Sequence, residues 1–254
     1  MSQTVLLVLV ALIGGIAITL LGPGGIFVTV ALHALGYSAA TVAGTASAAF
    51  VGTGIVGSAA YWRSGELAAP GVRRDALVLT AASVLGALGG SALNAVLDRQ
   101  SFGVALGVFV GATGLLVFAR QRGLLKPATA LDAGSRRAQW LMLGLGVAVG
   151  VPGGALGVGG PVLAVPLLVL CGVPMLTAVA MAQVQSVAIA GFATLGYVVR
   201  GTVDWPLALL IGVPLVIGTV IGWRLAQKTP TERLTTLLAT VLLVIGVYLV
   251  ATAV

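Results

Sequence analysis

Charged residues divide the chain into long uncharged blocks. Two blocks of 62 residues cover positions 1–62 and 138–199, and four shorter blocks cover 76–97, 100–119, 205–223 and 234–254. A helix rises about 1.5 Å per residue, so about 20 residues cross the roughly 30 Å hydrocarbon core of a bilayer. Each short block therefore predicts one membrane-spanning helix, and each long block predicts about three helical segments.

Glycine and proline divide each long block into three segments. The predicted segments are 4–21, 26–35 and 38–62 in the first block, and 138–156, 162–171 and 175–199 in the second. The middle segment of each block has about ten residues and a length of about 15 Å, half of the hydrocarbon thickness. Either the glycine-rich linkers complete a crossing, or the short segment re-enters the membrane from one side.

The order of the blocks repeats within the chain, and individual residues recur at a nearly constant spacing. At an offset of 135, Gly22, Gly24 and Gly25 correspond to Gly157, Gly159 and Gly160, and at an offset of 136, Tyr61 and Gly65 correspond to Tyr197 and Gly201. We therefore predict an N-terminal repeat over 1–119, a linker loop over 120–137 and a C-terminal repeat over 138–254, with about five helical segments in each repeat.

The basic residues indicate how these segments are oriented. If all five segments of a repeat cross, the loops 63–75, 120–137 and 224–233 share one side, which holds 11 basic residues against two on the other. If the short segments do not cross, the division is nine against four. Cytoplasmic loops are rich in Lys and Arg, so the first division is favoured and the linker is cytoplasmic. The predicted fold is thus an all-α polytopic membrane protein of two inverted repeats, each with a short broken helix.

The composition excludes several classes of protein. Of the 254 residues, 59% are hydrophobic and 7% are charged, whereas about a quarter are charged in soluble domains. The net charge of +7 lies in short loops, where membrane topology explains it, so we expect no nucleic-acid partner. The single cysteine, Cys171, excludes a disulfide framework. The sequence has no nucleotide-binding loop, HExxH motif or Ser-His-Asp set, so we expect no enzyme, ATP-driven pump, cofactor or metal.

The glycine clusters at 22–25 and 157–161 are the strongest candidates for a functional site. Glycine costs about 1 kcal/mol in a helix interior, so both clusters favour an unwound segment. Paired breaks in two repeats are typical of transporter binding sites. The short helices that follow direct N-terminal amides and positive dipole ends at the breaks, which favours an anion. The predicted binding residues there are Gly24, Gly25, Gly159 and Gly160. The alternative is that the glycines only allow close helix packing.

Four neutral polar residues form a second group of candidates. Thr45 and Ser47 lie near the start of the third segment of the first repeat, and Gln183 and Gln185 lie in the matching segment of the second. Their hydroxyl and amide groups are suited to hydrogen-bond an anion, and hydrogen bonding between helices is the alternative role. The two glutamines are separated by about 200° around a helix, so we do not expect them to face one cavity together.

One titratable side chain lies within the predicted membrane segments and changes charge near neutral pH. His33 occupies the first short segment, and no Asp, Glu, Lys or Arg lies within any predicted span. A relay of buried carboxylates is therefore not expected. His33 is the candidate for proton coupling, and a hydrogen-bonded packing histidine is the alternative.

The sequence resembles the sulfite exporter TauE/SafE family of membrane transporters at Gly157-Val-Gly-Gly-Pro-Val-Leu-Ala-Val-Pro-Leu-Leu and at Gly201-Thr-Val-Asp-Trp, with a weaker copy from Gly22 in the first repeat. The resemblance implies a multi-pass transporter of the prokaryotic cytoplasmic membrane for sulfite, thiosulfate or organosulfonates. By motif, it implies as site residues Gly24, Gly25, Gly159, Gly160, Thr45 and Ser47. Gln183 and Gln185 depart from the small hydroxyl pattern of the family, which leaves the particular anion open.

The expected mechanism is alternating access, in which one repeat moves against the other around a site near the membrane midplane. The expected partners are a small anion and the lipid bilayer, and a second copy of the chain is a further candidate. An anion channel and a non-transporting membrane scaffold subunit are the alternatives, because both can be built from the same interrupted helices.

Overall fold

The computed structural model describes residues 3–125, 132–228 and 232–253, and it is helical throughout these ranges apart from turns and short connections. The elements are α1 (Gln3–Leu20), the 3₁₀ turn η1 (Pro23–Gly25), α2 (Ile26–Ala34), α3 (Ala39–Arg63), α4 (Pro70–Asn94), α5 (Arg99–Gln121), α6 (Arg136–Leu156), α7 (Pro161–Leu170), α8 (Met175–Val199), α9 (Trp205–Ala226) and α10 (Glu232–Ala253). Eight of the described helices are long and apolar enough to cross a membrane, and α2 and α7 are shorter. The predicted all-α, polytopic membrane class is therefore confirmed.

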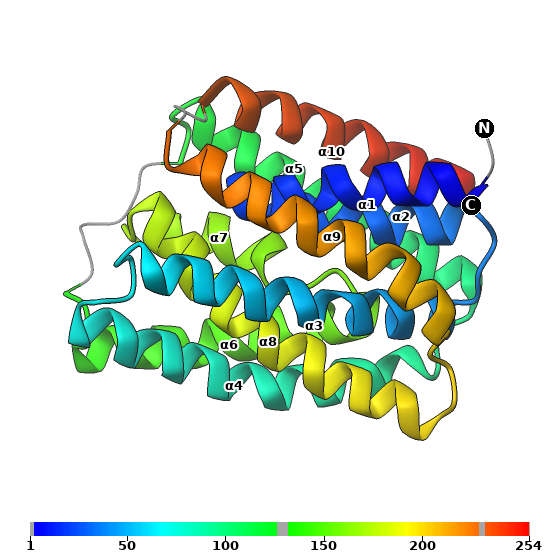
Figure 1. The fold of residues 1–254 in the computed structure, drawn as a ribbon, viewed down its shortest axis with the longest axis horizontal. Helices are drawn as coiled ribbons and strands as arrows, with labels where there is room; N and C mark the ends of the chain where they lie inside the picture. Colours follow the sequence, from blue (N-terminus) through cyan, green and yellow to red (C-terminus); the bar gives the residue numbers. More distant parts are fainter. Residues whose placement is uncertain (1–2, 126–131, 229–231, 254) are drawn as a thin grey trace.

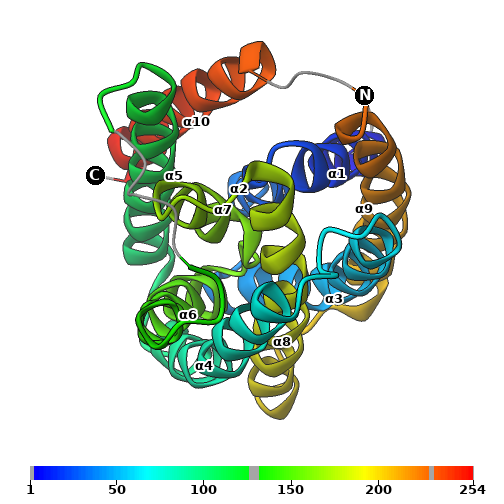
Figure 2. The same ribbon diagram turned by 90° about the vertical axis from the view of Figure 1, so that its left-hand side faces the viewer.

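The long helices surround the two short ones. Viewed along the helices, α2 and α7 lie near the centre, with α1, α9, α3, α8, α4, α6, α5 and α10 around them (Figure 2). Helices α3 and α8 pack against each other and are the most buried of the spans. Helix α3 also packs against α9, and α8 packs against α4. The outer pairs are α1 with α9, α4 with α6, and α5 with α10.

The short helices reverse the direction of the chain. Helix α1 begins at the end of the molecule where both termini lie, and α2 turns back toward that end (Figure 1). Helix α6 begins at the opposite end, and α7 turns back toward the end where α6 began (Figure 1). With nine and ten residues, the two short helices reach only part of the way across. Each short helix therefore leads the chain back toward the end of the molecule at which the preceding long helix began.

Glycine allows two of the outer helix pairs to approach closely. A Cβ atom on Gly86 of α4 would lie 2.7 Å from the Val147 carbonyl oxygen of α6, and a Cβ on Gly218 of α9 would collide with the Leu12 carbonyl oxygen of α1. Small residues at helix contacts are typical of membrane bundles, where close packing replaces the hydrophobic driving force. Many glycines outside the breaks therefore have a packing role.

Helix α4 begins six residues before the uncharged block that predicted it. Its first turns contain Arg73, Arg74 and Asp75. The Arg73 guanidinium lies 4.8 Å from the Trp62 ring centroid, and the buried Asp75 carboxylate accepts a hydrogen bond of 2.9 Å from the Gly134 amide. Polar residues and tryptophan are typical of membrane–water boundaries. Uncharged blocks therefore predict the hydrocarbon part of a helix and miss its polar end.

Candidate functional site at the paired helix breaks

The first break lies between α1 and α2. The amides of Leu21 and Gly22 both donate to the Ala17 carbonyl oxygen, at 2.9 and 3.0 Å, which ends α1. Gly22 has a φ of 103°, a conformation that side chains with a Cβ rarely adopt. Pro23 then starts η1, and α2 follows directly at Ile26. The chain therefore reverses its direction between Leu21 and Ile26.

The second break lies between α6 and α7 and has a different conformation. Gly157 caps α6 in the left-handed region, with a φ of 63°, and its amide donates to the Gly153 carbonyl oxygen at 3.1 Å. Gly159 also has a positive φ, of 77°. Pro161 is the first residue of α7, a position where its missing amide hydrogen costs no hydrogen bond.

The two breaks contact each other directly. The Thr29 hydroxyl of α2 donates to the Gly157 carbonyl oxygen at 2.7 Å. A Cβ on Gly25 would lie 2.6 Å from the Val158 carbonyl oxygen, and a Cβ on Gly22 would lie 2.9 Å from the Val165 side chain. The four predicted glycines, Gly24, Gly25, Gly159 and Gly160, are all buried. The starts of both short helices therefore belong to one closely packed centre.

Helices α3 and α8 form the walls of this centre. A Cβ on Gly159 would lie 3.7 Å from both Phe50 Cδ2 of α3 and Ser186 Oγ of α8, and one on Gly160 would lie 3.2 Å from Ser186 Cα. The Phe50 ring also lies against Gly25. The Ser186 hydroxyl has no hydrogen-bond partner within the described part of the chain. Phe50 thus touches both breaks, and Ser186 presents a free hydroxyl to the second.

Backbone amides at the second break are free to bind an acceptor. The amides of Gly159, Gly160 and Val162 have no hydrogen-bond acceptor among the described residues. The first amides of a helix carry the positive end of its dipole, equivalent to about half an elementary charge. An unpaired amide that is buried costs free energy comparable to a lost hydrogen bond. The centre is therefore suited to an anion.

The four polar candidates lie in different surroundings. Thr45 is buried, and its hydroxyl accepts a hydrogen bond of 3.1 Å from the Asp204 amide at the start of α9. Ser47 is buried and has no partner in the described ranges. The Gln185 amide donates to the Ser83 hydroxyl of α4 at 2.8 Å. In this conformation, Thr45 and Gln185 connect helices, and their role as anion ligands stays a prediction.

Gln183 is the most unusual of the four. It is fully buried in α8, and neither its carboxamide oxygen nor its nitrogen has a hydrogen-bond partner. A Cβ on Gly57 of α3 would lie 2.6 Å from the carboxamide oxygen, so the group faces α3. Gln185 faces α4 instead. The two glutamines therefore do not share a cavity, as their spacing predicts.

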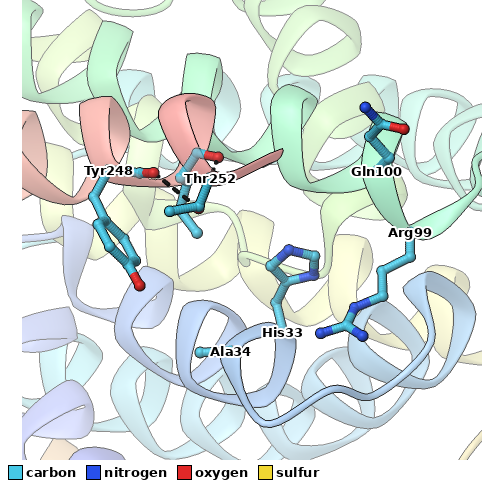
Figure 3. Close-up of a pocket in the computed structure, with 7 residues that line it drawn as sticks. His33, Ala34, Arg99, Gln100, Tyr248 and Thr252 are labelled. Carbon is cyan, nitrogen blue, oxygen red and sulfur yellow. Dashed lines mark hydrogen bonds between the residues drawn. The ribbon is translucent and has the colours of Figure 1, made fainter. Parts of the chain in front are cut away.

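His33 lies outside this centre. It is near the end of α2, where its ring lies 5.6 Å from the Phe102 ring and lines a separate cavity with Arg99 (Figure 3). No cluster of three or more His, Cys, Asp or Glu side chains suited to a metal occurs among the described residues. A proton-coupling role for His33 would therefore act from the periphery of the centre.

Sequence reasoning missed several residues that shape the site. Thr29 and His33 are the two polar residues of the short helix α2, and the contrast of Thr29 with its apolar neighbours was a usable signal. Tyr61 and Tyr197 donate to the carbonyl oxygens of Thr19 and Gly154, at 2.6 and 2.7 Å, so each fixes the last turn of a broken helix. No sequence signal distinguished Phe50 from the apolar residues of the spans.

Comparison with known proteins is consistent with a membrane transporter. Residues 7–249 match the sequence model of the family described as sulfite exporter TauE/SafE. A probable membrane transporter protein of Methanocaldococcus jannaschii is 28% identical over 113 residues, which cover 41% of this chain and 42% of that protein. The match thus spans less than half the length of that relative. No solved structure gives a significant match to the chain.

Proposed function

Because the chain belongs to the sulfite exporter TauE/SafE family, we propose that this membrane transporter is a secondary transporter of small anionic sulfur compounds, such as sulfite, thiosulfate or an organosulfonate. The observation that carries the proposal is the contact between the two helix breaks, where the amides of Gly159 and Gly160 at the second break have no acceptor among the described residues. The proposed location is the cytoplasmic membrane of a prokaryote.

The proposed anion site uses backbone rather than charged side chains. The amides of Gly159 and Gly160 and the positive end of α7 provide one half of the proposed site. Gly24 and Gly25 of η1, directly before α2, provide the other half, and the Gly24 amide must release the Gly22 carbonyl oxygen, to which it donates at 2.9 Å, before it can bind the anion. An anion near a helix N-terminus gains about 0.3–1 kcal/mol at an exposed site and up to about 2 kcal/mol when partly buried. A contribution of this size assists binding and still permits release, which a transporter requires.

Gln183 is the proposed side-chain ligand. Leaving a buried polar group unpaired costs about 1–3 kcal/mol, so a carboxamide without partners requires a compensating function. We propose that its amide group binds the anion in a conformation in which α8 has moved relative to α3. Ser47 is proposed to act with it, since both side chains are buried and unpartnered.

Inverted repeats and alternating access are the proposed basis of transport. The packing pairs correspond under exchange of the two halves, since α1 packs against α9 as α6 packs against α4. The tyrosine hydrogen bonds to the ends of α1 and α6 correspond in the same way. Rocking of one half against the other would open the closed centre to each side in turn. Proton coupling through His33 remains part of this proposal.

Transport assays with purified protein in vesicles test the function. We expect saturable uptake of one or more of sulfite, thiosulfate and organosulfonates, measured with and without a pH gradient, and loss of uptake in Gly159→Leu. Steady currents through single molecules would favour the anion channel. Neither flux nor binding of any of these anions, from a protein that is folded in the vesicles, would favour the scaffold subunit.

A further inference from the structure

A polar cavity lies at the end of the molecule that carries both termini. It has a volume of about 490 Å³, and its polar lining residues are His33 of α2, Arg99 and Gln100 of α5, and Tyr248 and Thr252 of α10 (Figure 3). The His33 ring and the Arg99 side chain lie side by side, with Tyr248 and Thr252 across the cavity from Arg99 (Figure 3). The cavity is therefore formed where three helices converge.

The cavity holds a positive charge that is not neutralised. Arg99 makes no ion pair with any described carboxylate. The preceding residue, Asp98, caps α5 instead, since its carboxylate accepts a hydrogen bond of 2.7 Å from the Ser101 amide. Hydrogen bonds from Ser101 also hold the pKa of the Asp98 carboxyl below its usual value. His33 Nδ1 is buried without a partner. The lining thus presents donors and a cation to an oxyanion.

A second, apolar crevice lies along α2 and α10. It has a volume of about 320 Å³ between α1, α2 and α10. Its lining residues are Val10, Ile13, Phe27, Val30, Ala31 and Ile245. On α2, Val30 and Ala31 of the crevice lie four and three positions before Ala34, which lines the polar cavity. On α10, Ile245 of the crevice lies three positions before Tyr248 and four before Leu249, which both line the polar cavity. Those spacings place residues of both hollows on one face of α2 and on one face of α10, so the apolar crevice lies next to the polar cavity along both helices.

We propose that this crevice binds one phospholipid, with its phosphate at Arg99 and His33 and an acyl chain along the apolar part. A guanidinium binds phosphate oxygens with two parallel hydrogen bonds, which suits Arg99 to this role. Basic pockets between membrane helices on the cytoplasmic side bind anionic lipid headgroups, and Arg99 offers the same chemistry at the opposite end of the bundle. A free inorganic anion would need only the polar cavity, whereas the crevice continues past it for an alkyl chain.

The packing of α10 leaves its other side available for a lipid. Helix α10 packs against α5, and it has no comparable packing against α1 or α2 within the described chain. Tyr248 is 62% exposed. A lipid in the crevice would connect α10 to α2, the helix that follows the first break. Lipid binding would therefore support the end of α2 without touching the glycine centre.

Native mass spectrometry of the purified full chain tests the proposal. The probes are phosphatidylglycerol and phosphatidylcholine with identical acyl chains, and glycerophosphoglycerol, the headgroup without chains. We expect one retained phosphatidylglycerol molecule, weaker retention of phosphatidylcholine, and no competition from the headgroup alone. Arg99→Gln should weaken phosphatidylglycerol binding by at least about tenfold, because both charge-assisted hydrogen bonds of the guanidinium are lost. Arg200→Gln is the matched control, because it removes a basic residue from another helix end that does not line the crevice.

A second variant probes the apolar part. Ala31→Trp should fill the crevice and abolish lipid retention while Arg99 remains, and Ala31→Val, which adds little volume, should retain it. Thermal unfolding and chromatographic profiles confirm that each variant is folded. Equal retention in Arg99→Gln and Arg200→Gln, equal competition by the headgroup alone, or a protein dimer in place of the lipid complex would overturn the proposal.

Discussion

Gly25→Ala is the substitution that most directly separates the two breaks. Gly25 has a φ of −60°, which any residue adopts, so the change introduces no backbone strain. The new Cβ would lie 2.6 Å from the Val158 carbonyl oxygen and 3.2 Å from Phe50 Cζ. Contacts of a Cβ below 3.0 Å essentially never occur in proteins, so the backbone of the second break must move.

The expected cost follows from this geometry. Inserting one carbon into a packed core costs about 1–3 kcal/mol. If the substitution destabilises only the conformation in which the two breaks are in contact, the population of that conformation relative to others decreases by roughly 5- to 150-fold. We expect a lower unfolding temperature and a lower rate of anion uptake, because the starts of α2 and α7 no longer share one centre.

The assay compares Gly25→Ala with Gly191→Ala. A Cβ on Gly191 of α8 would meet no atom within 4 Å, so that change adds about 1 kcal/mol of helix propensity and no collision. Uptake into vesicles and thermal unfolding are measured for both variants and for the unmodified protein. Wild-type uptake and stability in Gly25→Ala would refute the contact between the breaks as the basis of the site.

Three further predictions concern other residues. Gln183→Leu should raise the free energy of unfolding by about 1 kcal/mol and abolish uptake. Gln185→Leu should lower the free energy of unfolding, because the Gln185 carboxamide loses its hydrogen bond to Ser83. A destabilised Gln183→Leu with normal uptake would contradict this. Tyr61→Phe and Tyr197→Phe should each lower the free energy of unfolding by about 1 kcal/mol, because each removes one buried hydrogen bond. Clearly unequal decreases in the two variants would argue against equivalent halves. His33→Gln should leave uptake down an anion gradient intact and remove its response to a pH gradient; an unchanged response would exclude His33 from proton coupling.

The sequence was sufficient to predict the helices and where they break. Glycine and proline are intrinsically poor helix formers, so local chemistry alone located the interruptions near Gly22 and Gly157. The meeting of the breaks was not predictable, because it depends on Thr29 and Phe50, whose contacts join segments far apart in the chain. The cavity beside His33 was not predictable for the same reason, since it forms only where α5 and α10 converge on α2.

The central claim is that backbone amides at the paired breaks bind the transported anion. Nuclear magnetic resonance of glycine-labelled protein in lipid nanodiscs, titrated with sulfite and with a sulfonate, observes these amides directly. The account predicts saturable shifts of the Gly159 and Gly160 amide signals, with the Gly191 signal unchanged. Unchanged Gly159 and Gly160 signals in a preparation that transports the same anion would contradict it.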